Sequence, residues 1–291
     1  MTAIQMLALD IDGTILMPDG SLSLRVKRAI GEAQARGILV ALATSRRWAG
    51  TQALAQELGL IGPLILYDGA LICDARSGAA RLRRTLDPEQ ARAAAQTVGE
   101  HKLQVIAQYR NEQDERLLVS ADPPHPEWTR SYLERFEQQT TLFAPDNLAA
   151  LAPQMLRLCA FGPFDALRLA LDALDASPLG RQIMPMGSYN EAELTLFAPD
   201  ASKGEGVRWL AQQFDIPLAQ TMAIGDGIND ISMLQTAGLG VAMGAAAPEV
   251  RLAADVVTAD NAEDGAALAI ERYALDEDAP RPDEDATERS A

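Results

Sequence analysis

Short apolar runs alternate with amphipathic segments along the first third of the chain. The runs at 4–9, 38–44 and 63–69 are short and mostly apolar, which is typical of strands buried on both faces of a parallel sheet. Between them, 24–36 and 47–58 have the apolar spacing of helices. This order of strands and helices predicts a parallel α/β sheet with right-handed crossovers.

The same alternation returns in the last third of the chain. Both ends of the chain therefore indicate one α/β fold class, and we expect them to share a core. The expected helices lie at 202–214, 229–236, 248–254 and 263–273, and the expected strands at 220–225, 239–243 and 255–258.

The middle of the chain has several strand-like runs for each helix, which is typical of an α+β unit. One helix is expected to begin with Asp87 as its N-cap and Pro88 at its first position. We therefore predict an α+β insert at 84–190 within a core formed by 1–83 and 191–273. The strand-like runs lie at 103–109, 116–120, 154–161, 181–189 and 192–197, and the helical patterns at 127–139 and 164–175.

Charge and cysteine content limit the partners and the compartment. A net charge of −16 argues against a nucleic acid or an anionic membrane surface as a partner. No apolar run approaches the roughly 20 residues of a membrane span, and the N-terminus lacks the basic start of a signal peptide. Cys73 and Cys159 are too few for a disulfide framework, which favours a reducing cytoplasm.

The C-terminal segment 274–291 differs in composition from the rest of the chain. It holds seven acidic residues and two arginines, which leaves five net negative charges, and it contains almost no large apolar residues. Such a segment has too little apolar surface to offset the entropy of folding. We predict a disordered, solvated tail.

Two carboxylates follow the first predicted strand. Asp10 and Asp12 lie in the run DIDGT, and side chains two residues apart on an extended chain point the same way. Ionising both is costly without a cation, and the carboxyl end of a parallel strand is where open α/β sheets bind ligands. The alternative is a solvated turn, because Asp and Gly are common in turns.

A second acidic group follows the strand predicted at 220–225. The run GDGIND contains Asp226 and Asp230, and several carboxylate oxygens suit Mg²⁺. The alternative is a turn in which Asn229 or Asp230 caps the next helix. Two acidic strand ends in one parallel sheet favour the metal site.

A lysine and a threonine are candidates for binding an anion. Ser202 and Glu205 form a capping-box pattern, which places Lys203 in a first helical turn, where a cation is disfavoured unless an anion such as phosphate lies in front of it. Thr44 ends the second predicted strand and offers a hydroxyl, and the N–H groups after it offer further donors. The alternatives are a solvated surface lysine and a plain N-cap at Thr44 or Ser45.

These four segments, in this order, resemble the four motifs of the haloacid dehalogenase (HAD) superfamily: DIDGT, the threonine of ATSR, the lysine of SKG, and GDGIND. The long insert resembles the cap of the Cof-like, type IIB subfamily, and the stretch after GDGIND is similar to that subfamily almost throughout. The resemblance covers roughly 1–80 and 195–273 well and the insert weakly. It implies a Rossmann-like core with an inserted cap that acts as a substrate lid.

The resemblance also implies a function and a set of residue roles. The chain would be a Mg²⁺-dependent phosphatase that hydrolyses a small phosphorylated metabolite, first of all a sugar phosphate, through an aspartyl-phosphate intermediate. The alternatives are a phosphomutase of the same superfamily, a non-catalytic regulatory protein on this fold, and a receiver-like protein. The implied roles are nucleophile for Asp10 and general acid/base for Asp12, phosphate binding for Thr44, Ser45, Lys203 and Asn229, and Mg²⁺ binding for Asp10, the main-chain oxygen of Asp12, Asp226 and Asp230.

Three positions depart from the family pattern. Ser45 replaces the usual glycine, Asp68 stands where the family has asparagine in NGA, and Thr195 stands where glutamate is frequent. An additional carboxylate near a phosphate site is unfavourable unless it turns away or is paired, and Arg46 is the candidate partner of Asp68. The polar candidates of the insert are Arg157, Arg181, Tyr189 and His125, each with an ordinary surface position as the alternative.

Overall fold

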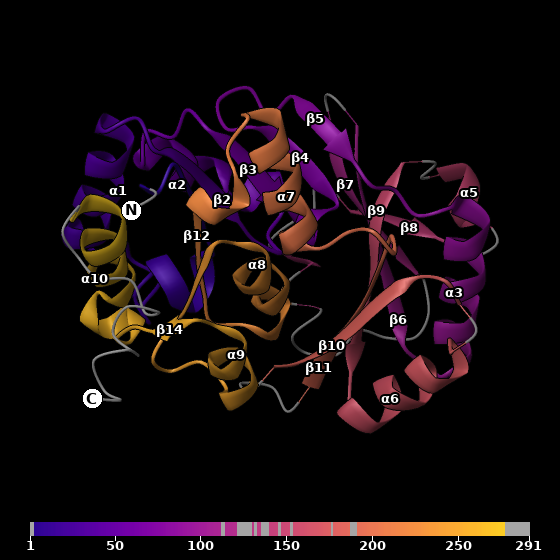
Figure 1. Ribbon diagram of the computed structural model, residues 1–291. Coiled ribbons are helices and arrows are strands. Elements are labelled where there is room, and N and C mark those ends of the chain that lie inside the picture. The colour runs from indigo at the N-terminus through magenta and orange to yellow at the C-terminus, as the bar shows by residue number, and fades with distance from the viewer. Residues whose placement is uncertain are drawn as a thin grey trace. The chain divides into compact units, whose positions relative to one another are not determined.

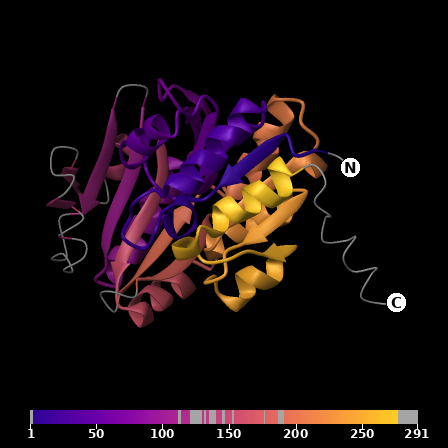
Figure 2. The same cartoon turned by 90° about the vertical axis from the view of Figure 1, so that its left-hand side faces the viewer.

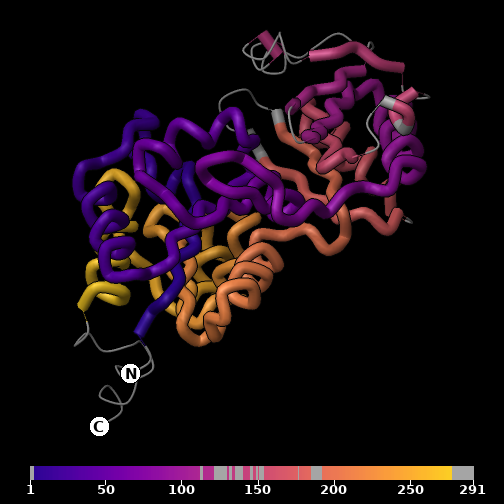
Figure 3. The backbone as a smooth tube through the Cα atoms, turned by 90° about the horizontal axis from the view of Figure 1, so that it is seen from above, coloured from indigo at the N-terminus to yellow at the C-terminus, as the bar shows by residue number. Residues whose placement is uncertain are grey.

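The computed structural model describes residues 3–111, 114–120, 130, 133–134, 140–144, 147–151, 154–175, 177–186 and 191–276. The chain divides into two compact units, one formed by Met1–Leu82 with Ser202–Ala291 and the other by Arg83–Ala201. The first unit therefore combines the two ends of the chain, which are indigo and orange to yellow in Figure 3.

The core of the first unit is an eight-stranded sheet (Figure 1). From one edge to the other its strands are β14 (Val256–Val257), β13 (Leu239–Ala242), β12 (Thr221–Gly225), β1 (Met6–Leu9), β2 (Leu39–Ala43), β3 (Pro63–Leu66), β4 (Leu71–Asp74) and β5 (Ala80–Arg83). From β14 to β3 each strand is parallel to its neighbours, and β4 runs antiparallel to β3. The predicted parallel-rich α/β sheet is confirmed.

Burial explains which strands could be recognised in the sequence. Every residue of β1, β3, β12 and β13 is buried, so these strands require uninterrupted apolar runs. The strands β4 and β5 were not predicted. The edge strand β5 is partly exposed and carries two arginines in four residues, so its apolar signal is weak.

Six helices accompany the sheet in the described part of this unit: α1 (Leu24–Ala35), α2 (Gln52–Glu57), α7 (Lys203–Gln213), α8 (Ile231–Thr236), α9 (Pro248–Ala253) and α10 (Gly265–Ile270). Side chains of α7, α8 and α9 share one apolar cluster with β1, β2 and β12. The helices α1 and α10, far apart in the sequence, contact each other and lie side by side (Figures 1 and 2). Each helix among the described residues is too short or too polar to cross a membrane.

The described chain continues past α10 in one further helical turn, Glu271–Leu275. Leu275 is buried, and its carbonyl oxygen accepts a hydrogen bond from the Arg36 guanidinium. The prediction that the disordered tail begins at residue 274 is therefore wrong, because Leu275 finds an apolar site and a backbone partner. Residues 277–291 of the predicted tail lie outside the described residues.

The second unit contains a six-stranded sheet. In spatial order its strands are β10 (Gly180–Met186), β11 (Glu191–Phe197), β9 (Met155–Gly162), β6 (Gln104–Arg110), β7 (Glu115–Ser120) and β8 (Thr140–Phe143). Its helices are α3 (Pro88–Glu100), α5 (Leu148–Leu151) and α6 (Phe164–Ala173), and α3 and α6 share an apolar cluster with the sheet. As predicted, Asp87 caps α3, since its side chain accepts from the N–H groups of Glu89 and Gln90.

Two expectations for this unit differ from the structure. The strand β11, which we expected in the core segment 191–273, pairs antiparallel with β9 and β10, and the compact unit extends to Ala201. Alternating apolar residues identify a strand but not the sheet that it joins. Neither β8 nor α5 was predicted, and most of the expected helix at 127–139 lies outside the described residues.

Candidate active site

Two neighbouring strands deliver the first carboxylates of the site. Asp10 follows β1, and its N–H donates to the carbonyl oxygen of Ile224 in β12 at 3.0 Å. Because β1 and β12 are parallel, their carboxyl ends meet at the same edge of the sheet, and Asp226 directly follows β12. The two acidic strand ends recognised in the sequence therefore lie next to each other.

Gly13 lets the chain turn closely past Asp226. Its φ of +78° is favourable only without a side chain, and a Cβ atom there would lie 2.3 Å from Asp226 Oδ2. The next residue, Thr14, donates its hydroxyl to Asp226 Oδ1 at 2.9 Å. The glycine and threonine of DIDGT thus hold the second carboxylate in place, a role that the sequence pattern did not indicate.

Lys203 lies at the centre of the carboxylates. As predicted, it follows the N-cap Ser202, whose side chain accepts from the N–H of Glu205. Its side chain is 1% exposed, and Nζ lies 2.6 Å from Asp10 Oδ1 and 2.5 Å from Asp230 Oδ1. The anions that stabilise this cation at a helix N-terminus are therefore the chain's own aspartates.

Both carboxylate oxygens of Asp230 accept hydrogen bonds. Oδ1 accepts from Lys203, and Oδ2 accepts from the N–H groups of Asp226 at 3.0 Å and Gly227 at 2.8 Å. The side chain is completely buried. Asp230 therefore acts mainly as a support that fixes Lys203 and the backbone of the GDGIND loop.

The electrostatics of the cluster favour a bound cation. Burial, followed by the charge of Asp230, raises the pKa of Asp10 well above its ordinary value despite the opposing effect of Lys203. The same two causes raise the pKa of Asp226 to about 6. For Lys203, burial acts to lower the pKa, but the charges of Asp10 and Asp230 outweigh it and raise the pKa above its ordinary value.

Oxygen atoms of Asp10, Asp226 and Asp230 all lie within 4.8 Å of one another. This donor set consists only of carboxylate oxygens, as hard divalent cations prefer. Because Asp230 already accepts three hydrogen bonds, Asp10 and Asp226 have more acceptor capacity left for a direct bond to a metal ion. The residues present therefore fit a metal ion.

Thr44 directly follows the end of β2, the strand next to β1 in the sheet, and is 1% exposed. Its N–H donates to Ile65 in β3, and its Oγ1 accepts from the N–H of Arg46 at 3.1 Å. Among the described residues none accepts the hydroxyl proton of Thr44, so it can serve an anion. Ser45 beside it is half-buried.

Arg46 has a role that the sequence did not reveal. It was the candidate partner of Asp68, but its guanidinium pairs with Asp12, with Nε 2.7 Å from Oδ2 and Nη2 2.5 Å from Oδ1. The only sequence signal was an arginine two positions after Thr44. Which carboxylate that arginine reaches depends on the path of the loop.

The hydrogen-bond partners of Asp68 and Asn229 also differ from those expected. The Asp68 carboxylate accepts from Asn229 Nδ2 at 2.9 Å, so the amide expected to bind phosphate is already partly engaged. Asp68 is buried, and its backbone has the left-handed values φ 54° and ψ 33°. This conformation carries the side chain towards the GDGIND loop.

The polar candidates of the insert have protein partners or lie outside the described residues. Arg157 is buried and donates to Gln108, and Arg181 donates to the carbonyl of Leu174 and to Asp175. Thr195 donates to Glu193 within β11. His125 and Tyr189 lie outside the described residues.

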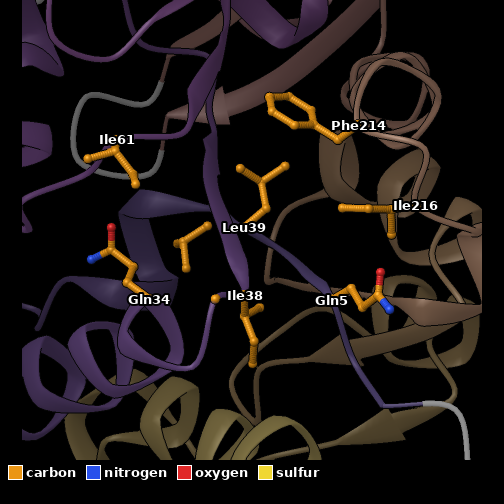
Figure 4. A pocket seen from close by; sticks show the side chains of 9 residues that line it. Gln5, Gln34, Ile38, Leu39, Ile61, Phe214 and Ile216 are labelled. Carbon is orange, nitrogen blue, oxygen red and sulfur yellow. The ribbon is translucent and has the colours of Figure 1, made fainter.

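A separate cavity of about 360 Å³ lies around the start of β2 (Figure 4). Its walls include Gln5, Leu39, Ile61, Phe214 and Ile216, and none of its lining residues carries a charge. Since Leu39 begins β2 and Thr44 follows its end, the cavity lies at the opposite ends of the strands from the aspartates. Without an ionisable group it lacks the means for acid–base or metal chemistry.

Comparison with known proteins identifies the family. Residues 7–270 match the model of the haloacid dehalogenase-like hydrolases, so the chain belongs to this family. The predicted membership of the HAD superfamily is confirmed, and the predicted core and cap architecture agrees with the fold of its structural neighbours.

Individual relatives are similar over nearly the whole chain. The phosphatase YwpJ of Bacillus subtilis is 29% identical to this chain. The match covers 90% of this chain and 97% of YwpJ. A HAD subclass IIB sugar phosphatase of known structure has a TM-score of 0.76 at 24% identity, with coverage of 94% of this chain and all of the other. A chloroplastic endoribonuclease YBEY of Arabidopsis thaliana is 28% identical over 91% of this chain, which spans only 46% of that protein's length.

Proposed function

We propose that this chain is a Mg²⁺-dependent phosphatase that hydrolyses a small phosphorylated metabolite through an aspartyl phosphate on Asp10. The observation that carries the proposal is the buried contact of Lys203 Nζ with Asp10 Oδ1 at 2.6 Å, within a cluster that also contains Asp226 and Asp230. Three separate segments of the chain contribute to this one arrangement. The family and the phosphatases among its relatives support the reaction class.

The two leading aspartates have different roles in this proposal. Lys203 holds Asp10 Oδ1, so Oδ2 attacks phosphorus while the bond from phosphorus to the ester oxygen breaks. Asp12 begins this step protonated, with one oxygen released from Arg46, and gives its proton to the departing oxygen. In the second step water attacks phosphorus, its proton passes to Asp12, and the bond to Asp10 breaks. Inorganic phosphate leaves, and both aspartates return to their starting states.

The remaining groups stabilise charge. Thr44, the Ser45 N–H, Lys203 and Asn229 are proposed to donate to phosphoryl oxygens. Mg²⁺, held by Asp10, the main-chain oxygen of Asp12 and Asp226 with support from Asp230, would when bound neutralise charge on the carboxylates and the phosphoryl group.

A sugar phosphate is the proposed substrate class, and the structural neighbour that is a sugar phosphatase supports it. Flavin- and pyridoxal-type phosphates are the other candidates. The insert is proposed to act as the lid that selects the leaving group. A cytoplasmic location agrees with this kind of substrate.

Two rivals make different predictions. A phosphomutase returns the phosphoryl group to its substrate, whereas a phosphatase releases inorganic phosphate. A non-catalytic protein on this fold has no need for Asp10, Asp12, Lys203 and Asp226 together, and the chain retains all four.

The test is a screen of phosphorylated metabolites by release of inorganic phosphate, with Mg²⁺ and with excess chelator. We expect release from at least one compound, loss of release in chelator, and none from Asp10→Asn. Conversion of a sugar phosphate to its isomer without release would establish the mutase. Absence of any turnover would favour the non-catalytic protein.

A further inference from the structure

A hydrogen bond between Asp68 and Asn229 joins two loops of the first unit. Asn229 Nδ2 lies 2.9 Å from Asp68 Oδ1, although the residues are 161 positions apart. Asp68 is 8% exposed, and Asn229 is half-buried. A hydrogen bond to a charged acceptor is strengthened where water is largely excluded.

The loop that carries Asp68 is held between two segments expected to bind phosphate. The Asp68 N–H donates to the carbonyl of Thr44 at 3.1 Å. On the other side Gly69, with φ +93°, lies so close to Ser202 that a Cβ would be 2.0 Å from its carbonyl oxygen. Ser202 directly precedes Lys203. The position of Asp68 is therefore fixed relative to both Thr44 and Lys203.

A carboxylate at position 68 determines which way the Asn229 amide points. An ionised carboxylate accepts hydrogen bonds and cannot donate them, so it selects the NH₂ end of the amide. The amide oxygen then lies towards Gly227, where a Cβ would be 2.4 Å from it. The family pattern has asparagine at the position of Asp68. Such a side chain carries both a donor and an acceptor, so it could pair with either the NH₂ or the oxygen of Asn229.

We propose that Asp68 is a positioning residue that orients Asn229 so that the second N–H of its amide donates to a phosphoryl oxygen. One N–H is used by Asp68, and the other, which donates to none of the residues that the structure describes, can serve an acceptor-rich anion. Asp68 acts through Asn229 and does not itself contact the reacting atoms. The inference rests on the proposed phosphatase function.

The first test is a double-mutant cycle in the Mg²⁺-loaded enzyme with Asp68→Ala, Asn229→Ala and the double variant. The readouts are kcat and KM for p-nitrophenyl phosphate and the inhibition constant of inorganic phosphate. We expect each single variant to weaken phosphate binding about tenfold, and the double variant also about tenfold, because both remove one interaction. Losses that multiply to about a hundredfold would overturn the inference.

Two further variants test whether phosphate binding needs the orientation of the Asn229 amide or only a hydrogen bond that joins the two loops. Asp68→Asn keeps an acceptor for Asn229 and should stay within about threefold of wild type. Asp68→Asn combined with Asn229→Asp restores a hydrogen bond with its direction reversed but removes the N–H offered to phosphate. We expect a melting temperature near that of wild type with phosphate binding still weakened about tenfold. Recovery of phosphate binding in this reciprocal variant would contradict the proposal.

Measuring wild type in parallel separates a failure of the proposed phosphatase function from a failure of the proposed role of Asp68. No phosphate release by wild type from aryl or sugar phosphates would refute the proposed function. An active wild type whose two alanine variants have multiplying losses would refute only the role of Asp68.

Discussion

The Arg46 guanidinium holds both carboxylate oxygens of Asp12, with Nε 2.7 Å from Oδ2 and Nη2 2.5 Å from Oδ1. A further nitrogen, Nη1, donates to the carbonyl of Gly50 and ties the pair to the following turn. The proposed general acid/base is thus oriented by a residue from a different loop. A bidentate pair fixes direction as well as distance.

Arg46→Ala should therefore affect proton transfer more than substrate binding. We expect kcat for alkyl phosphates to fall about tenfold, since misplacing a reacting group by a small distance is costly. Aryl phosphates should lose less, because their leaving groups need little protonation. Arg81→Ala is the control, since Arg81 pairs with Asp74 at the surface, where ion pairs contribute little. Equal losses on both substrate types would contradict the role of Arg46.

Metal binding should depend on pH through Asp226. Burial, followed by the charge of Asp230, raises its pKa from 3.8 to about 6. In the metal-free protein, the stability contributed by this group is present below its unfolded pKa and is lost as the pH rises through about 6. Mg²⁺ needs the ionised carboxylate, so its stabilising effect should grow over the same interval.

The measurement is the increase in melting temperature on adding Mg²⁺ at about pH 5 and at about pH 7.5, on either side of the raised pKa. We expect a clearly larger increase at the higher pH. Asp226→Asn, which keeps the size of the side chain, should give little increase at either pH, and its turnover should fall steeply. An equal increase at both pH values in wild type would argue against Asp226 as a ligand.

Gly13 offers a test of close packing beside Asp226. Gly13→Ala should lose about 1–2 kcal/mol of stability through its left-handed backbone, and more through collision with the carboxylate. Gly20→Ala is a matched control, because Gly20 has φ +81° and a Cβ there would meet no atom within 4 Å. We expect chemical denaturation to show a loss for both variants, but loss of Mg²⁺-dependent turnover only for Gly13→Ala. Full activity in Gly13→Ala would mean that the close approach is not needed.

The C-terminal boundary can be tested by two truncations. Removing 277–291 should leave melting temperature and turnover nearly unchanged, because this segment is acidic and poor in apolar residues. Removing 274–291 also removes the buried Leu275 and the acceptor of the Arg36 hydrogen bond. This longer truncation should cost about 1–3 kcal/mol. A large loss from the shorter truncation would show that the last residues dock.

The core sheet and the position of the site were predictable because each depends on a local pattern. Buried parallel strands need continuous apolar runs, and Asp10 and Asp226 each follow such a run. The carboxyl ends of parallel strands then meet whatever the details of the loops. This rule was sufficient to expect Asp10 and Asp226 close together, whereas the place of Lys203 beside them was implied only by the family resemblance.

Side-chain pairing between loops was not predictable in the same way. Whether Arg46 reaches Asp12 or Asp68 depends on backbone angles that few residues adopt, such as the left-handed conformations of Tyr67 and Asp68. The sheet to which β11 belongs depends on long-range pairing that alternation does not encode. Short or partly exposed strands such as β5 leave too weak a pattern to recognise.

The central claim is that Asp10 forms the covalent bond to phosphorus while Asp12 moves the proton. It is tested most directly by intact-protein mass spectrometry after rapid acid quenching of wild type, Asp10→Asn and Asp12→Asn mixed with an aryl phosphate. In Asp12→Asn the first step needs little protonation, but hydrolysis of the aspartyl phosphate lacks its base, so a phosphate adduct should accumulate. In Asp10→Asn no adduct should form, whereas an adduct that persists in this variant would contradict the assignment of the nucleophile.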